Sequence, residues 1–362
     1  MTAVRVQGNR LVDQAGREVV LRGVSHSGSE YTCVHGKGVF EGTMDSSFVA
    51  GLKSWKNLNA VRLPLNEDCW LGINGVGSGG DTYQDAYMKA VELLTSANIA
   101  VLADLHWTAP GTSKATGQQQ LPDRDHAPKM WSEVATAFRN NPLVIFELFN
   151  EPFLGNSDAK AKDWICWANG TQCSGIHFQP AGQAELLQSV RATGASNVVL
   201  MGGMAWSNDL SHWLEYAPYM RDPIHQSAAV WHSYANNACN RQSCWDRTIK
   251  SVADHVPVVV TEMGHGISWA QGLMKWIEIQ GGTISYLPWT WNTWGAAAVA
   301  AVSAEANSSS RLVASVEESV PTQRSWGAGE ALVKNYTTGE PTDWGKAVKD
   351  SFANAKVGVP SA

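Results

Sequence analysis

The chain has 362 residues, with 27 basic and 33 acidic side chains, which gives a formal net charge of −6 at pH 7. This mildly acidic balance gives no reason to expect nucleic acid or an anionic membrane as a partner. A chain of this length can bury a large core without help from a metal or a disulfide. Because no run of about 18 apolar residues occurs, no membrane span is expected. We also expect the protein to be a monomer that binds neither a metal nor another cofactor.

Short apolar runs alternate with amphipathic segments along the chain. Eight runs predict strands, at residues 20–26, 59–66, 100–107, 143–150, 197–205, 228–234, 257–264 and 283–292. Most are continuously hydrophobic, as expected for parallel strands that are buried on both faces. Segments with apolar residues at three- and four-residue steps predict helices. They lie at residues 46–57, 83–98, 128–140, 183–193, 244–254, 269–279 and 344–352, with a shorter, less regular one at 211–220.

The eightfold alternation of strand and helix predicts an α/β fold, a closed (β/α)8 TIM barrel rather than an open doubly wound sheet. No Gly-rich phosphate loop follows a predicted strand, which also argues against a dinucleotide-binding fold. Residues 4–6 and 18–20 predict a small N-terminal β-hairpin that plugs the barrel floor. We expect one domain over residues 1–362. Residues 293–320 are interpreted as a long loop after strand eight, at the end of the barrel where the strands' carboxyl ends meet.

The six cysteines predict disulfide bonds. Two pairs are close in the sequence, Cys166 with Cys173 and Cys239 with Cys244, which leaves Cys33 with Cys69. Six cysteines allow many pairings, so proximity is the only guide here. None has the CxxC spacing of a zinc site, and an even number in polar loops suits an oxidising compartment. We therefore expect a secreted protein whose signal peptide has been removed, with a cytosolic protein bearing free thiols as the alternative.

Two glutamates come at predicted strand ends, where the catalytic groups of such barrels lie. Glu151 follows the fourth run and Glu262 lies in the seventh, so the two would face each other across the barrel mouth. Glycoside hydrolysis needs such a pair, one protonated to assist the leaving oxygen and one ionised to attack the anomeric carbon or activate water. A separation of about 5–5.5 Å would give retention of configuration, and about 6.5–9.5 Å would give inversion.

The motifs around these glutamates resemble those of glycoside hydrolase family 5, the cellulase-like family of retaining β-glycosidases in clan A. The segment IFELFNEP at 145–152 resembles the family's strand-four motif, and VVTEMG at 259–264 resembles its nucleophile strand. Further matches follow in order: VLRGV at 20–24, AVRLP at 60–64, DLH at 104–106, HSY at 232–234, and Trp289. Each motif is modest alone, but together they cover the whole predicted barrel and are highly specific.

The resemblance implies roles for individual residues. Glu151 would be the general acid/base, and Glu262 the nucleophile, kept ionised by hydrogen bonds from Arg62 and Tyr234. Asn150 would bond the sugar 2-hydroxyl, a contact that strengthens in the transition state. The remaining implied residues bind the sugar or orient the carboxyl groups: His106, His232, and Trp289 as the stacking floor, with Trp291 as the alternative floor in another strand register.

Other residues near strand ends are open between a substrate role and a structural role. His26, after strand one, slightly favours a substrate contact, while Asp104 and Glu147 are interpreted as structural partners within the barrel. Glu30, Tyr31, Glu67 and Asp68 could line the site or be solvated loop residues. Tryptophans after strand ends are candidates for further sugar subsites, with core packing as the alternative: Trp70, Trp107, Trp206 and Trp294.

The family includes several activities, so the substrate is a choice between alternatives. An endo-β-1,4-glucanase acting on a polysaccharide or oligosaccharide by double displacement is the first hypothesis. Long segments at 108–127, 153–179 and 293–340 could wall the cleft into a pocket, which favours an exo-acting β-glycosidase or an arabinofuranosidase-type enzyme on short or branched glycosides. A mannanase or xylanase of the same family, a non-catalytic carbohydrate-binding barrel and a metal-dependent enzyme are further alternatives.

Overall fold

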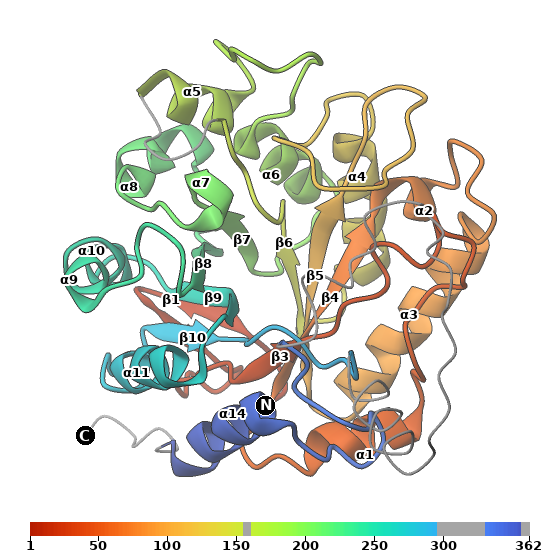
Figure 1. Cartoon of the computed structure of the whole chain (residues 1–362). Helices are drawn as coiled ribbons and strands as arrows, with labels where there is room; N and C mark the ends of the chain where they lie inside the picture. Colours follow the sequence, from red (N-terminus) through yellow and green to blue (C-terminus); the bar gives the residue numbers. More distant parts are fainter. Residues whose placement is uncertain (155–160, 295–329, 356–362) are drawn as a thin grey trace, which may run out of the picture.

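The computed structural model describes residues 1–154, 161–294 and 330–355 (Figure 1). Eight strands pair in parallel, in sequence order, from β3 to β10. They are β3 (Gly23–Ser25), β4 (Ala60–Asn66), β5 (Ala100–Trp107), β6 (Val144–Glu147), β7 (Val199–Gly202), β8 (Ser227–Tyr234), β9 (Val258–Gly264) and β10 (Ile284–Tyr286). Each strand falls on one of the eight predicted runs, which confirms the predicted (β/α)8 barrel.

The barrel closes between its first and last strands. Arg22 and Tyr286 form a parallel bridge, and the backbone N–H of Tyr286 donates to the carbonyl of Leu21 over 2.9 Å. The backbone N–H of Ser25 donates to the carbonyl of Pro288 over 3.1 Å. These bonds join the two edges of the sheet, so the eight strand ends meet around one mouth.

Helices surround the barrel (Figure 1). The long ones agree with the predicted segments: α1 (Ser46–Lys53), α3 (Asp81–Ser96), α4 (Ala127–Phe138), α6 (Gln183–Ala192), α11 (Ile267–Glu278) and α14 (Asp343–Asn354). The predicted segment 211–220 is α8 (Trp213–Tyr216) plus a 3-10 turn (Ala217–Met220). The segment 244–254 is broken into α9 (Gln242–Cys244), a π-helical turn (Trp245–Ile249) and α10 (Lys250–Ala253). Short helices α2 (Glu67–Leu71), α5 (Ala161–Asn169) and α7 (Met204–Ser207) were not predicted.

The N-terminal hairpin is present, but its second strand differs from the prediction. β1 (Arg5–Gln7) pairs with β2 (Arg10–Val12), whereas Glu18 makes only an isolated bridge to Val12. The tight turn after β1 is the reason, because Gly8 has φ +61°, a left-handed conformation that glycine adopts without strain. The hairpin does close the barrel floor, since Leu11 packs in one apolar cluster with residues at the lower ends of the strands.

The barrel interior changes from apolar at the floor to charged at the mouth. Along β5, Ala100 and Leu102 belong to the floor cluster, and the next inward residue, Asp104, is a fully buried acid. The alternate residues Val101 and Ala103 pack outward in the cluster between barrel and helices. The alternation of side chains along each strand thus delivers polar groups to the upper layer, where the predicted site residues lie.

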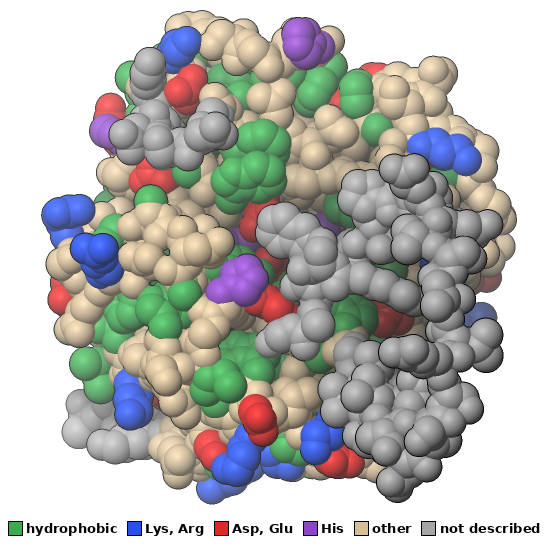
Figure 2. All heavy atoms as spheres, in the orientation of Figure 1, with side chains coloured by type: hydrophobic (Ala, Val, Ile, Leu, Met, Phe, Trp, Pro, Cys, Tyr) green, Lys and Arg blue, Asp and Glu red, His purple; other side chains and the backbone are tan. Residues whose placement is uncertain are grey.

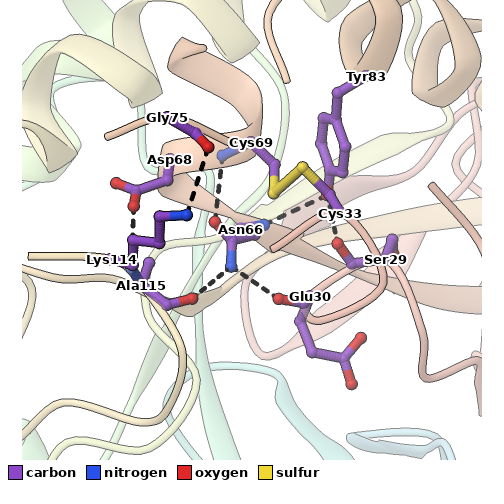
Figure 3. The surroundings of a disulfide bond; sticks show 10 residues. All are labelled: Ser29, Glu30, Cys33, Asn66, Asp68, Cys69, Gly75, Tyr83, Lys114 and Ala115. Carbon is purple, nitrogen blue, oxygen red and sulfur yellow. Dashed lines mark hydrogen bonds between the residues drawn. A yellow bond between two sulfur atoms is a disulfide. The ribbon is translucent and has the colours of Figure 1, made fainter. Parts of the chain in front are cut away.

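All three predicted disulfide bonds are present: Cys33–Cys69, Cys166–Cys173 and Cys239–Cys244. Cys33–Cys69 joins the β3–α1 loop to α2 (Figure 3). Beside it, the Asn66 amide donates to the carbonyls of Glu30 and Ala115 over 2.7 and 2.8 Å. Three successive β–α loops are therefore tied together next to the barrel mouth.

Replacing Cys33 and Cys69 with serine is expected to lower the free energy of unfolding by about 4 kcal/mol. The reason is that the bond closes a 36-residue separation, and loop-closure entropy grows with that length. The matched Cys166/Cys173 double variant should lose only about 2 kcal/mol, since its separation is 7 residues. Denaturant unfolding of both variants measures the difference. Equal losses would show that loop length is not the source of the stabilisation.

Candidate active site

The two predicted catalytic glutamates lie together at the barrel mouth. A carboxylate oxygen of Glu151, which follows β6, and one of Glu262, in β9, lie within 4.8 Å of each other and of a ring nitrogen of His232. Figure 2 shows acidic and histidine side chains gathered near the centre of this face, next to a hydrophobic patch. The 4.8 Å limit on one pair of oxygens is closer to the carboxyl spacing of about 5–5.5 Å in retaining enzymes than to the spacing of about 6.5–9.5 Å in inverting enzymes.

A β-bulge turns Glu262 into the barrel. Trp231 pairs with Val260, but the next residue, His232, pairs with Glu262, so Thr261 is an extra residue in β9. In a regular strand the side chains of Thr261 and Glu262 would point to opposite faces. With the bulge, both reach the interior: Thr261 donates to Glu147, and Glu262 accepts from Arg62.

Arg62 organises the acidic groups under the mouth. Its guanidinium is fully buried and makes a two-pronged pair with Glu147, at 2.9 Å for each N–O contact. It also lies 2.9 Å from Asp104 and donates to Glu262 over 2.6 Å. A fifth contact, 2.6 Å to the Asn150 side-chain oxygen, fixes that amide. The charge of Arg62 therefore holds three acids in place, and Asp104 and Glu147 are structural partners, as interpreted from the sequence.

Glu262 is held in its ionised form. Burial alone would raise the pKa of this carboxyl group, but the charges of His232 and Arg62 and the Tyr234 hydroxyl lower it to about 2. The two hydrogen bonds expected from the sequence are both present, from Arg62 over 2.6 Å and from the Tyr234 hydroxyl over 2.7 Å. Glu262 is therefore an anion with fixed orientation and is only 5% exposed.

Glu151 has the opposite tendency. Burial raises its pKa, with a further contribution from the negative charge of Glu262, against the lowering effect of the His232 hydrogen bond. Nδ1 of His232 lies 2.9 Å from Oε1 of Glu151. Nε2 lies 2.9 Å from the Thr261 hydroxyl, which donates onward to Glu147, so Nε2 is the ring's donor on that side. Nδ1 therefore faces Glu151 and orients its carboxyl group.

The next two predicted residues form one wall of the mouth. Nδ1 of His106 lies 2.6 Å from Asp104, and the imidazole is stacked against the Trp289 indole, with ring centroids 5.8 Å apart. Burial lowers the pKa of His106, but the adjacent Asp104 carboxylate outweighs this and raises it above its usual value. Trp289 is partly exposed, so one aromatic face and one imidazole border the glutamate pair.

Two predicted substrate contacts are wrong. His26 is fully buried, with Nδ1 2.8 Å from the Trp291 carbonyl and its ring against Phe48. Trp291 is also fully buried, and its indole packs on Trp55 with centroids 4.8 Å apart. Both residues belong to the packing outside the barrel, because the chain after β10 directs Trp289 to the mouth and Trp291 away from it. Trp291 is thus excluded as the stacking floor.

The tryptophans proposed for outer subsites separate into two groups. Trp70 is 1% exposed and packs in the core, so its subsite role is wrong. Trp206 is 39% exposed and is stacked on Phe153 with centroids 3.8 Å apart, and Phe153 lies two residues after Glu151 in the chain. Trp107 contacts the Tyr31 ring, and Trp294 lies 6.4 Å from Trp289. These three remain on the rim of the mouth.

The short helix α7, which carries Trp206, has an unusual backbone. Ala205, Trp206 and Ser207 have φ of 53°, 63° and 56°, so three consecutive non-glycine residues are left-handed. Each costs roughly 1–2 kcal/mol and persists only where the surroundings fix it. Here the backbone N–H of Trp206 donates to the Pro152 carbonyl over 3.0 Å, and the Ser207 hydroxyl donates to that of Asn150 over 2.8 Å. α7 is thus attached to the segment that carries Glu151.

Sequence reasoning missed several residues of the site. Gln118, from the β5–α4 loop, accepts from the Asn150 side chain over 2.9 Å and donates to the Glu151 carbonyl over 3.1 Å. Glu330 lies 3.0 Å from Nε2 of His265, beside Tyr234. No motif contains these residues, because they come from long loops whose course the strand pattern does not determine. The predicted loop at 293–320 lies almost wholly outside the described residues.

The comparisons with known proteins agree with this geometry. The family model of cellulases, glycosyl hydrolase family 5, matches residues 12–295. An endoglucanase of Halalkalibacter akibai is 29% identical over 147 residues, 41% of this chain and 16% of that protein. An endoglucanase of Thermobifida fusca is 22% identical over 263 residues, 72% of this chain and 48% of that protein. This chain therefore spans less than half the length of either relative.

Among solved structures, a β-glucanase from Saccharophagus degradans in complex with cellotetraose has a TM-score of 0.67 at 19% identity. The match covers 98% of this chain and 93% of that one, which shows a shared fold. A closed barrel with two facing carboxyl groups at its mouth is the arrangement of a glycoside-hydrolase barrel. The chain belongs to the cellulase family, glycosyl hydrolase family 5.

Proposed function

We propose that the protein is a retaining glycoside hydrolase that cleaves β-linked glucan, as an endo-β-1,4-glucanase. One observation carries the proposal: two carboxyl groups with oxygens within 4.8 Å have pKa values shifted in opposite directions, that of Glu262 lowered and that of Glu151 raised. This division of protonation states at a short separation is what double displacement requires.

In the first step, the Glu262 carboxylate attacks the anomeric carbon while Glu151 donates its proton to the departing glycosidic oxygen. The C–O bond to the leaving sugar breaks as the glycosyl ester to Glu262 forms. In the second step, Glu151, now ionised, takes a proton from a water that attacks the same carbon and releases Glu262. Two inversions at one carbon return the original β configuration.

The neighbouring residues support these steps. Nδ1 of His232 lies 2.9 Å from Glu151 and positions this carboxyl group, and the proton taken from the attacking water restores its protonated state. Asn150 is fixed by Arg62 and Gln118, as expected for a group that bonds the sugar 2-hydroxyl. Trp289 presents the stacking floor beside the scissile bond, and His106 bonds a hydroxyl of the same sugar.

The endo assignment is supported by the relatives named endoglucanase and by the structure solved with cellotetraose. The three disulfide bonds support a secreted enzyme. No helix in the described residues is long and apolar enough to cross a membrane. The test combines viscometry of soluble cellulose derivatives with an aryl-glycoside assay. Rapid viscosity loss supports endo cleavage, whereas activity on the aryl glycoside alone would replace it with an exo-acting enzyme.

The value of kcat/KM should be constant at pH values between the pKa of Glu262 and the pKa of Glu151. Activity requires ionised Glu262 and protonated Glu151, so kcat/KM should fall as pH rises through the raised pKa of Glu151. On the acid side, it should stay high far below the usual range for glutamate, because the pKa of Glu262 is about 2. A pH–rate profile on a soluble substrate, run with unfolding controls, checks both limbs. An acid limb near the ordinary glutamate pKa of about 4.3 would contradict the assignment.

Replacing Trp206 with alanine should raise KM for long cello-oligosaccharides by roughly 3–10-fold and leave kcat for a short aryl glycoside unchanged. The exposed Trp206–Phe153 stack would bind a sugar on the leaving-group side of Glu151, and an aromatic stack is worth about 0.5–1.5 kcal/mol. Trp206→Phe, which keeps an aromatic ring, is the matched control. A KM that does not change with chain length would remove Trp206 from the subsites.

A further inference from the structure

A second group of ligand-type side chains lies beside the β4–α2 and β5–α4 connections. Glu67 is the first residue of α2, and Asp123 and His126 directly precede α4. Nδ1 of His126 lies 3.5 Å from Oδ1 of Asp123 and 3.7 Å from Oε1 of Glu67. Both acids are fully buried, and the His126 side chain is 21% exposed. None of the three takes part in the proposed reaction.

One buried oxygen of each acid in this group lacks a donor. The other oxygen accepts from a backbone N–H: Oδ1 of Asp123 from His126 over 2.9 Å, and Oε1 of Glu67 from Ala109 over 3.4 Å. Oε2 of Glu67 and Oδ2 of Asp123 are inaccessible to solvent and accept no hydrogen bond from an N–H or hydroxyl of the described residues. A hydrogen bond between the two carboxyl groups needs an added proton on one of them. Asp68 and Asp125 add further negative charge nearby. Burial of several acids at one place requires a compensating cation or protons.

We propose that Glu67, Asp123 and His126 bind one Zn²⁺ ion. Zinc takes imidazole nitrogen and carboxylate oxygen at about 2.0–2.2 Å in tetrahedral geometry, which places neighbouring ligand atoms roughly 3.3–3.5 Å apart. The distances from Nδ1 to Oδ1 of Asp123, 3.5 Å, and to Oε1 of Glu67, 3.7 Å, are close to that spacing. Nδ1 also lies 3.4 Å from the Ala109 carbonyl and would exchange this contact for the ion. Calcium prefers about six to eight oxygen ligands, so the imidazole favours zinc.

The ion would fasten the β5–α4 loop to α2. Asp123 and His126 end this loop, and Gln118 in its middle contacts Asn150 and the Glu151 carbonyl. The other side of α2 already bonds the loop, since Asp68 accepts from the Ala115 N–H over 2.9 Å (Figure 3). The role is structural: the ion restrains one wall of the active site, and no step of the proposed reaction involves it.

The test measures zinc binding in the Glu262→Gln variant of the full chain. This background is needed because Glu151, His232 and Glu262 form another trio within 4.8 Å that could take the ion. After treatment with EDTA and its removal, calorimetry should find one Zn²⁺ per chain. At about 100-fold excess over Kd, the Tm should rise by roughly 5 °C. If calorimetry detects no heat of zinc binding and the Tm does not change, the proposal is overturned, and Glu67 and Asp123 share a proton instead.

Two further variants locate the bound ion. In the same background, Asp123→Asn and His126→Gln should each abolish the zinc-dependent Tm shift. Both should fold in EDTA, since the first removes a buried charge and the second changes a partly exposed side chain. Glu185→Gln, which alters a partly exposed carboxylate paired with Arg124, is the matched control and should keep the full shift. A shift that survives in both site variants would place the ion elsewhere and overturn the proposal.

Discussion

Replacing Glu262 with alanine is expected to lower kcat on a soluble glucan by about 10,000-fold or more while the protein stays folded. Without the carboxylate, no glycosyl ester can form, and loss of a nucleophile removes the covalent route as a whole. Folding should survive, because Arg62 keeps its pairs with Asp104 and Glu147 when this partner is lost. Steady-state kinetics and circular dichroism measure the two effects separately.

Added azide distinguishes the roles of the two glutamates. In Glu262→Ala, azide can enter the vacated space and attack the anomeric carbon once, so the product from a β-glycoside with a good leaving group should be the α-glycosyl azide. In Glu151→Ala, the glycosyl ester still forms, and azide should give the β product. Glu133→Gln, an exposed residue on α4, is the control and should retain full activity. A β azide from Glu262→Ala would remove Glu262 as nucleophile.

The strands and the position of the glutamate pair could be predicted because their signals are local. Near-continuous apolar runs specify parallel strands buried on both faces, and each run ends where polar residues begin. Asn150 ends such a run and Glu151 directly follows it, so their place at the mouth needs only the barrel topology. The sequence separation of the cysteines also indicated their pairing, since short loops close most readily.

The failures concern features that depend on packing between distant segments. The inward orientation of Glu262 depends on the β-bulge at Thr261, and no pattern of residues in the sequence predicts this bulge. Trp289 and Trp291 are both plausible floors in sequence, and only the course of the chain after β10 separates them. His26 is polar and ends a strand, yet its ring fills a space against Phe48. The sequence shows the chemical type of each of these residues, whereas the groups that surround each side chain are determined by the tertiary structure.

Removing the guanidinium of Arg62 should affect stability and catalysis together. In Arg62→Met, the buried acids Asp104 and Glu147 lose their cation, which should lower the free energy of unfolding by about 3–5 kcal/mol at neutral pH. The pKa of Glu147 is lowered in the folded state, so the stability that Arg62 provides through this acid is complete above the unfolded pKa of about 4.3 and disappears as the pH falls through the lower folded pKa. The loss caused by Arg62→Met should therefore shrink as the pH falls below about 4. Denaturant unfolding at several pH values measures this.

The same substitution should move the acid limb of the pH–rate profile to higher pH. Arg62 is one of the charges that lower the pKa of Glu262, so without it a larger fraction of the nucleophile is protonated at a given acidic pH. Arg62→Lys keeps a positive charge but not the two-pronged geometry, and should give a smaller shift of the limb with a smaller loss of stability. If Arg62→Met lost stability but kept the wild-type acid limb, the guanidinium would support only the fold, and the ionisation of Glu262 would depend on His232 and Tyr234.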